Sequence, residues 1–377
     1  MSAVDPTGHY SIADWGFAVV DRDGTLVMAT PGVPEGYEPR LERPGETGLK
    51  IVSGFLAGAE IELAVNEEGR VIGGMAGGVI PVERLDSPPE IAPGGGLRAP
   101  VVPPDPERDR LFAERWAETS PGGIPVIDGH PVHVFVDWLS RRDEVIFHGS
   151  TRTSIEEFVP RREWMEIGND GRQGNLGAVY GTHYGLWAMF FAIIDRSSLR
   201  GSIRNGVGMY ESATGDRLDL YRFSVDHRSL PQRPFIAGML YMLPRDRFER
   251  IALYPGGPFS NEWACFEPVR PVARLPVKPE DFPFLDQIGG HDDGDLVRLS
   301  EVGDEVFAHL AGFAPITGGF RLVFEGLDPS IRDEWIELGR RLFPDIARTL
   351  VDEVTVEMTG PQAFLDTMGK RLAELDG

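Results

Sequence analysis

Cysteine is nearly absent from this chain of 377 residues, because Cys265 is the only one. A single cysteine excludes an intrachain disulfide and any metal site built from several thiolates. No stretch approaches the roughly 18 apolar residues that a membrane span needs. Residues 1–6 also lack the basic and apolar regions of a cleaved signal peptide. We therefore expect a cytoplasmic protein that does not enter the membrane, and export without a cleaved signal would fit the same sequence.

Positive charge is scarce too, since 37 Lys and Arg stand against 59 Asp and Glu, which gives a net charge of −22. Residues 144–278 contain 17 basic and 15 acidic residues, a net charge of +2, and the rest of the chain carries 20 against 44, a net charge of −24. An acidic surface repels phosphate backbones, which disfavours nucleic acid as a partner. The near-neutral middle segment remains suited to an anionic dinucleotide.

The distribution of proline and glycine predicts four regions. Residues 1–86 alternate short β-prone runs with turns, which indicates a β-rich accessory domain. Residues 87–106 are so rich in Pro and Gly that we expect a linker without regular structure. Residues 107–280 form the expected central domain, which begins with a helix at 107–118. Residues 281–377 form a small acidic α/β domain.

Apolar periodicity predicts the elements of these regions. In the central domain, strands are expected at 145–149, 176–181, 203–210, 217–225, 236–243, 263–269 and 271–277. An aromatic-rich run predicts a helix at 184–194. After residue 281, strands are expected at 319–324 and 354–358, and helices at 328–342 and from residue 361 onward. The predicted fold class is α+β with antiparallel strands.

Three stretches of the central domain combine β-prone residues with polar groups suited to ligand binding. The first is Phe147-His148-Gly149-Ser150, where an apolar run ends in a histidine, a glycine and a hydroxyl residue. The second is Gly177-Ala-Val-Tyr180, which precedes the aromatic helix. The third is Asn261-Glu262-Trp263, which precedes an apolar run. Each stretch would recur by chance alone, but the three occur in order, each beside an expected strand.

Together the three stretches resemble the His–Tyr–Glu signature of the diphtheria-toxin-like and poly(ADP-ribose)-polymerase-like ADP-ribosyltransferases, over about residues 144–280. The resemblance implies a split pair of antiparallel sheets that hold NAD between them. It implies Glu262, His148 and Tyr180 as the catalytic residues. NAD would be the substrate whose nicotinamide–ribose bond is broken, and no metal is expected.

The resemblance also implies a role for each residue. His148 would bond the adenosine ribose, and the Gly149 backbone, next to Ser150, would hold the nicotinamide amide. Tyr180 would stack on the nicotinamide ring, because an aromatic face suits a flat cation. Glu262 would bond the 2′-hydroxyl of the nicotinamide ribose. Breaking the glycosidic bond puts positive charge on that ribose, so a carboxylate there stabilises the transition state more than the ground state.

Structural roles for the same residues are the alternative. His148 would then be a core or turn histidine, Tyr180 a packing residue and Glu262 an exposed turn carboxylate. Phe190 and Phe191 favour core packing over ligand contact. The resemblance nevertheless implies that one of the two takes a second stacking position beside the ligand, and we assign Phe190 to it. Many relatives have a small hydroxyl residue where this chain has Trp187-Ala188, which bears on the nicotinamide contacts. Glu267 is a rival for the acid, although it lies within the expected strand.

Three functions follow from these expectations. The first is a toxin-like NAD-dependent mono-ADP-ribosyltransferase that modifies an acceptor protein or another macromolecule. The second is an NAD glycohydrolase, in which water is the acceptor. The third is an inactive module that binds NAD or ADP-ribose. The run His291-Asp-Asp-Gly-Asp295 lacks the spacing and the closing glutamate of a calcium loop, so we expect a solvated turn there.

Overall fold

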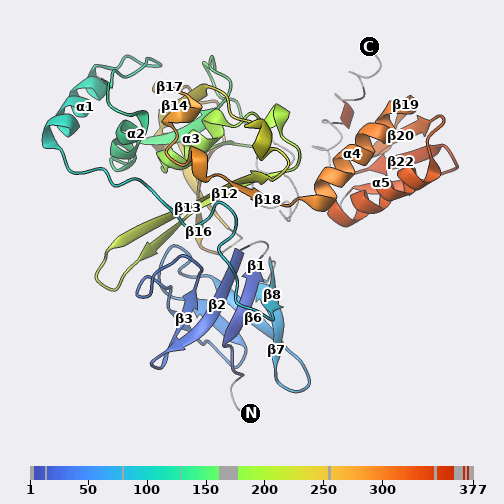
Figure 1. Ribbon diagram of the computed structural model, residues 1–377, viewed down its shortest axis with the longest axis horizontal. Coiled ribbons are helices and arrows are strands. Elements are labelled where there is room, and N and C mark those ends of the chain that lie inside the picture. The colour runs from blue at the N-terminus through green and yellow to red at the C-terminus, as the bar shows by residue number, and fades with distance from the viewer. Residues whose placement is uncertain are drawn as a thin grey trace.

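The structure is a computed structural model. It describes residues 4–12, 15–78, 80–127, 129–160, 177–253, 256–343, 346–360, 368–369 and 372. The protein has a mixed α+β fold, rich in strands, with several antiparallel sheets (Figure 1). Its buried apolar side chains form separate clusters, one from the first 82 residues, a group from residues 112 to 288 and one after residue 299.

The N-terminal region is a closed β-barrel. Its strands are β1 (Gly8–Ile12), β2 (Trp15–Arg22), β3 (Thr25–Ala29), β4 (Leu41–Glu42), β5 (Gly48–Ile51), β6 (Glu60–Val65), β7 (Val71–Ala76) and β8 (Ile80–Leu85). They pair in the order β3-β2-β1-β8-β7-β6-β5-β4. An isolated bridge between Val27 and Arg40 joins β3 to the start of β4 and closes the ring. Closure leaves no long unpaired edge.

The described residues of the central region form three α-helices and most of the remaining strands. The helices are α1 (Pro106–Glu118), α2 (Val132–Ser140) and α3 (Gly185–Ile193), and the strands are β9 (Leu97–Arg98), β10 (Val145–Ser150), β11 (Val179–Gly181), β12 (Ile203–Glu211), β13 (Arg217–Asp226), β14 (Gly238–Pro244), β15 (Glu249–Ala252), β16 (Phe259–Cys265), β17 (Ala273–Val277) and β18 (Gly289–His291). Three sheets form, in the orders β10-β14-β17, β11-β16-β15 and β12-β13-β18. The strands and the aromatic helix expected from the periodicity are present, with boundaries that move by a few residues.

Both ends of the central region are attached to β13. Strand β9 pairs with β13 at Leu97 and Arg98, and β18 pairs with it in parallel through His291. The expectation that residues 87–106 hold no regular structure is therefore wrong at Leu97 and Arg98. Gly94 also accepts a hydrogen bond from the backbone N–H of Phe223, and its φ of 67° suits a glycine. The Pro/Gly composition hid a short strand whose partner lies over 100 residues away.

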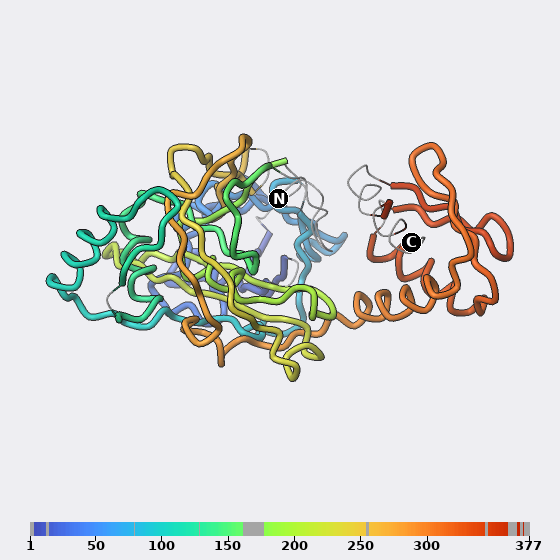
Figure 2. Tube along the Cα trace, turned by 90° about the horizontal axis from the view of Figure 1, so that it is seen from above, coloured from blue at the N-terminus to red at the C-terminus, as the bar shows by residue number. Residues whose placement is uncertain are grey.

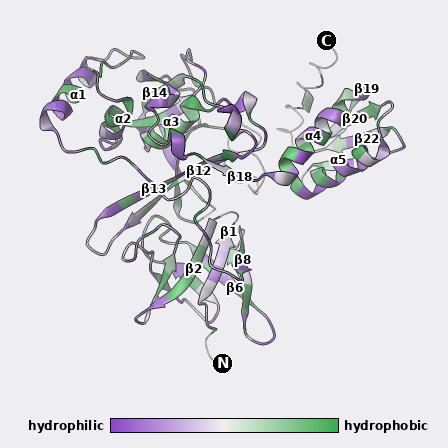
Figure 3. Ribbon diagram, viewed as in Figure 1, coloured by the Kyte–Doolittle hydropathy of each residue, from purple (hydrophilic) through white to green (hydrophobic). Residues whose placement is uncertain are grey.

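Helix α3 is buried on nearly every side, because eight of its nine residues are inaccessible. Its apolar character is evident in Figure 3. The helix rests directly on the backbone of the β10-β14-β17 sheet. A Cβ added at Gly149 would collide with the Ala188 carbonyl, and one added at Gly238 would collide with that of Ala192. Two glycines therefore set how closely helix and sheet approach.

Residues 294–359 of the C-terminal region, apart from the undescribed 344–345, form a four-stranded antiparallel sheet with two α-helices. Its elements are α4 (Gly294–Ala308), β19 (Leu310–Ile316), β20 (Gly319–Phe324), α5 (Pro329–Leu342), β21 (Ala347–Leu350) and β22 (Thr355–Thr359). The sheet order is β19-β20-β22-β21. Figure 2 shows α4 leading from the central region into this sheet. The helix expected after residue 361 lies mostly outside the described residues, although Met368 and Leu372 are buried in the local core.

Short 3-10 helices complete the described elements. They span Arg196–Ser198, Leu230–Gln232, Arg245–Arg247, Pro279–Asp281 and Leu285–Gln287. The barrel contacts the central region through the rings of Phe55 and Tyr210, whose centroids lie 5.7 Å apart. Leu253, which follows β15, also packs against the barrel core. The barrel therefore packs against the central strands and is not connected to them by the linker alone.

Candidate functional site

The candidate site is built at a fork between β10 and β11. Phe147 donates its backbone N–H to the carbonyl oxygen of Thr182 (2.7 Å), and Thr182 donates back to the carbonyl oxygen of Phe147 (3.0 Å). Beyond this bridge β10 continues along β14, and β11 continues along β16. The fork brings the first two sequence stretches together, and the third stretch joins them on β16.

Gly149 presents backbone hydrogen-bonding groups to this fork. In a strand, the N–H and C=O of successive residues point alternately to its two edges. Because Phe147 bonds toward β11, Gly149, two residues later, also points toward the β11 side. Within the described part of the chain, no hydrogen bond from β11 reaches Gly149. Its N–H and C=O therefore suit recognition of a planar amide, which carries one donor and one acceptor group.

The His148 ring is oriented by the second stretch. Its Nδ1 lies 2.7 Å from the backbone carbonyl oxygen of Tyr180. Since a carbonyl only accepts, Nδ1 carries a proton, and a neutral ring then presents Nε2 as an acceptor. The ring also meets Phe158 edge-on, with centroids 4.7 Å apart. His148 is half-buried, so it is neither a free turn residue nor a fully enclosed core histidine.

Tyr180 and Glu262 project from the same face of the β11–β16 ladder. Tyr180 pairs with Ala264, and Glu262 lies two residues before Ala264 on β16. Since side chains alternate along a strand, residues two apart share a face. Both residues are half-buried. The register alone therefore puts the aromatic ring and the carboxylate on one side of the sheet.

The Glu262 carboxyl group lies in surroundings that disfavour its charge. Burial raises its pKa above the ordinary value. No described residue donates a hydrogen bond to this carboxyl group, although its backbone N–H donates to the Ser260 hydroxyl oxygen (3.1 Å). A carboxylate that is desolvated yet still reachable at its surface is a common feature of catalytic sites.

Hydrogen bonds from neighbouring elements hold the β16 turn in place. The Thr182 hydroxyl donates to the carbonyl oxygen of Asn261 (2.9 Å), and the Asn261 side-chain amide donates to the carbonyl oxygen of Val207 (2.7 Å). The Trp187 indole donates to the Asn205 side chain (2.6 Å). Strand β12 is thus tied to both α3 and β16. Trp187 is therefore a buried residue that links α3 to β12.

Phe190 and Phe191 occupy opposite environments. The Phe190 ring is fully buried among Phe223 and Phe282. It is therefore a core residue in this structure, which confirms the favoured expectation of core packing and makes its assignment to a ligand-stacking position wrong. Phe191 is only half-buried, with the guanidinium carbon of Arg196 5.6 Å from its ring centroid. Helical periodicity does not separate two adjacent aromatic residues, because either face can be the buried one.

The remaining candidates are placed as follows. Ser150 ends β10, half-buried, and its hydroxyl accepts from the N–H of Arg152 (3.2 Å). Glu267 lies beyond the end of β16, exposed, and pairs with Arg247 at 2.6 Å. The expected strand therefore ends before Glu267. An exposed, paired carboxylate outside the fork is a poor candidate for the acid.

A histidine that the sequence patterns did not single out lies next to the site. His183 follows Thr182, and its Nδ1 accepts a hydrogen bond from the Trp263 indole (3.2 Å). Burial, with the nearby charge of Arg217, lowers the pKa of His183 to about 4. The imidazole is therefore neutral at physiological pH, as an acceptor for the indole must be. Its only sequence signal is a position between the second stretch and the helix.

The run at 291–295 is only partly solvated, because His291 and Asp293 belong to a buried polar network whereas Asp292, Gly294 and Asp295 are exposed. The expectation of a solvated turn is therefore wrong for His291 and Asp293. His291 is 3% exposed, and its two ring nitrogens each lie 2.9 Å from an oxygen, of Ser224 and of Asp293. Asp293 also accepts from Ser202 (2.6 Å) and Arg204 (2.9 Å). Burial alone would raise the pKa of Asp293, but the hydrogen bonds outweigh it and hold the pKa well below its usual range.

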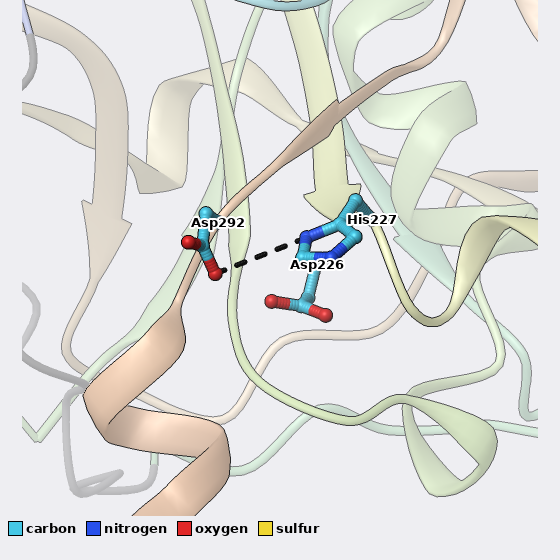
Figure 4. A group of neighbouring side chains, drawn as sticks. All are labelled: Asp226, His227 and Asp292. Carbon is cyan, nitrogen blue, oxygen red and sulfur yellow. Dashed lines mark ion pairs between the residues drawn. The ribbon is translucent and has the colours of Figure 1, made fainter.

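Next to this network, Asp226, His227 and Asp292 converge closely enough to suggest a cation site (Figure 4). His227 Nδ1 lies 3.9 Å from Asp292. The Arg228 guanidinium already bridges the two carboxylates, at 3.1 Å from each. Its positive charge satisfies them, and we assign no metal here.

Comparisons with known proteins return no relative. No protein-family model matches the chain, and no curated protein and no solved structure is significantly similar to it.

Proposed function

We propose that the protein is an NAD-dependent mono-ADP-ribosyltransferase whose site is the fork between β10 and β11. The observation that carries the proposal is the convergence of three sequence stretches there. Gly149 offers a backbone donor and acceptor, the His148 ring is held by the Tyr180 carbonyl, and Tyr180 and Glu262 share one face. These groups match the needs of NAD, which carries an amide, an aromatic cation and ribose hydroxyls.

The chemistry assigned to the site is substitution at the nicotinamide ribose. The C–N bond breaks, nicotinamide leaves with the bonding electrons as a neutral ring, and positive charge develops on the ribose. Glu262, as a carboxylate, stabilises that charge as it forms. The acceptor then bonds to the same ribose carbon and loses a proton. Tyr180 stacks on the nicotinamide, and Gly149 fixes its amide.

NAD labelled in its adenylate part tests the proposal when it is incubated with the full chain, with and without cell lysate. Free nicotinamide together with labelled macromolecule is the expected result. Nicotinamide and free ADP-ribose at the same rate without lysate would instead assign a glycohydrolase. Binding without turnover would assign an inactive binding module. If the protein neither binds NAD nor turns it over, the proposal is wrong.

Matched variants locate the activity in the molecule. Glu262→Gln keeps the size of the side chain and removes its charge. Glu267→Gln makes the same change five residues away, in an exposed carboxylate that pairs with Arg247. We expect the first variant to lose activity and the second to keep it. The reverse pattern would move the acid to Glu267.

A further inference from the structure

A second candidate site lies in the C-terminal region, far along the chain from the fork. A groove of about 750 Å³ runs between α5 and β21. Asp333, Ile336 and Glu337 line it from the helix, and Ile346 and Arg348 line it from the strand side. Strand β21 is at the end of its sheet and pairs only with β22 among the described strands. The groove therefore follows an open sheet edge.

Arg348 lies in this groove, and no described residue forms an ion pair with its guanidinium. It pairs with the buried Met358 on β22, so its side chain projects from the face of the sheet that packs on α5. Its guanidinium carbon is 5.3 Å from the centre of the Trp335 ring, and a Cβ added at Gly339 would collide with the guanidinium. Both Nε and Nη1 are shielded from solvent and have no hydrogen-bond partner among the described residues.

The two described carboxylates that line the groove are paired with other arginines. Glu337 pairs with Arg340 at 2.9 Å, and Asp333 pairs with Arg332 at 2.8 Å. Burial lowers the pKa of Arg348 to about 10, so it still carries its charge at neutral pH. A buried donor without a partner costs free energy, and a charged one costs more. An incoming anion would offset that cost.

The edge of β21 adds a second recognition element. The N–H of Val351 bonds to Thr355 on β22, so the backbone of Val351 faces inward. By alternation Thr349 and Ala347 also face β22, whereas Arg348 and Leu350 turn their N–H and C=O groups outward. A strand added at this edge would bond to Arg348 and Leu350. Its residue opposite Arg348 would share the face of the Arg348 side chain.

We propose that this groove binds an extended peptide, which pairs with β21 and places one Asp or Glu carboxylate against the Arg348 guanidinium. Residues 281–377 contain 20 acidic and 8 basic residues. The surrounding field is therefore negative, and it favours basic residues on either side of that single carboxylate. The partner is a protein segment of alternating pattern, and the site is independent of the NAD chemistry.

A displayed library of random octapeptides tests the proposal, selected on the full chain and counter-selected on Arg348→Gln. We expect peptides of alternating β-prone residues with an Asp or Glu at one fixed position. A synthetic copy of a selected peptide should bind the parent protein at least tenfold more tightly than the Glu→Gln form of that peptide does. The Arg348→Gln protein should bind both peptides equally. Arg340→Gln, which changes a paired arginine on the groove wall, should stay within twofold of the parent.

A second pair of variants tests strand addition. Leu350→Pro removes an outward N–H and leaves the β21–β22 pairing intact, since proline is tolerated on a free strand edge. Leu350→Ala removes the side chain and keeps the N–H. The proline variant should lose at least tenfold in affinity for the winning peptide, and the alanine variant much less. Equal binding by both would overturn strand addition, and enriched peptides that need neither Arg348 nor an acidic residue would overturn the site.

Discussion

The His148 imidazole and the Tyr180 backbone are joined by a 2.7 Å hydrogen bond across the fork between β10 and β11. The bond ties the orientation of the ring to the strand that carries the proposed stacking tyrosine. A displacement of β11 would therefore move both groups together. The proposed ribose contact and the proposed nicotinamide contact are thus coupled by one backbone carbonyl.

Glu262→Gln should retain NAD binding and reduce nicotinamide release by roughly 10²-fold or more, the usual scale for one lost electrostatic partner. Because burial raises the pKa of Glu262, turnover in the parent should rise with pH through a value above the ordinary one of about 4.3. A pH profile of kcat for the parent and the variant measures the loss of nicotinamide release and the rise of turnover with pH. An acid limb that persists unchanged in the variant would assign it to another group.

His148→Ala and Tyr180→Ala should each weaken NAD binding by about 1–3 kcal/mol, through loss of a buried hydrogen bond or of ring stacking. Tyr180→Phe keeps the ring and should stay close to the parent. Calorimetric titration measures the affinities, and circular dichroism checks that the variants are folded. Unchanged affinity in both alanine variants would place NAD elsewhere.

Phe191→Ala and Phe190→Ala should separate ligand contact from core packing. Phe191 is half-buried at the end of α3, so its loss should lower NAD affinity with a small change in stability. Phe190 is fully buried, and its loss should cost about 3–5 kcal/mol of unfolding free energy. Urea denaturation and NAD titration of the same two proteins give the comparison. Equal stability losses would contradict the burial difference.

Gly149→Ala should destabilise the central region, because the new Cβ collides with backbone atoms of α3 rather than with a flexible side chain. Overpacking of this kind costs about 1–3 kcal/mol or more. Gly206→Ala is the matched control, since nothing lies within 4 Å of a Cβ there. Denaturation curves measure the difference. A variant as stable as the control would mean that α3 can shift freely on the sheet.

His183 should contribute to acid sensitivity. Its pKa in the folded protein is about 4, against about 6.5 when unfolded, so the unfolded chain binds the extra proton between these values. Stability is then complete above about pH 6.5 and falls by up to about 3 kcal/mol as the pH drops toward 4. His183→Asn should flatten this part of the profile. Unfolding free energies measured from pH 4 to 7 test whether His183 causes this loss of stability.

Local sequence patterns predicted the secondary-structure elements that depend on local residue chemistry. The strands β10, β13 and β16 alternate apolar and polar residues or run into turns, and these patterns predicted them. Helix α4 was missed, because Gly294 and Gly303 weaken its helical signal. Two of its residues, Val302 and Val306, are fully buried, so tertiary packing stabilises the helix.

Errors arose where a distant partner decides the structure. Nothing within 291–295 reveals that Ser224 and Arg204 will enclose His291 and Asp293, so an acidic, glycine-containing run indicated solvent. Arg348 is similar, because its environment depends on a helix that precedes it and a strand that follows. Buried polar groups are specified by their partners, and partners are a property of the fold.

The attachment of β9 and β18 to the same strand constrains the order of folding during synthesis. The barrel needs only the first 85 residues, and it can close while the rest of the chain is still being made. Strand β13 cannot complete its sheet until His291 has left the ribosome. The fork needs β16, which ends at Cys265, so it must wait until about 70% of the chain has been made. A nascent protein stalled before that point would expose the β13 edge and the apolar helix α3 to chaperones.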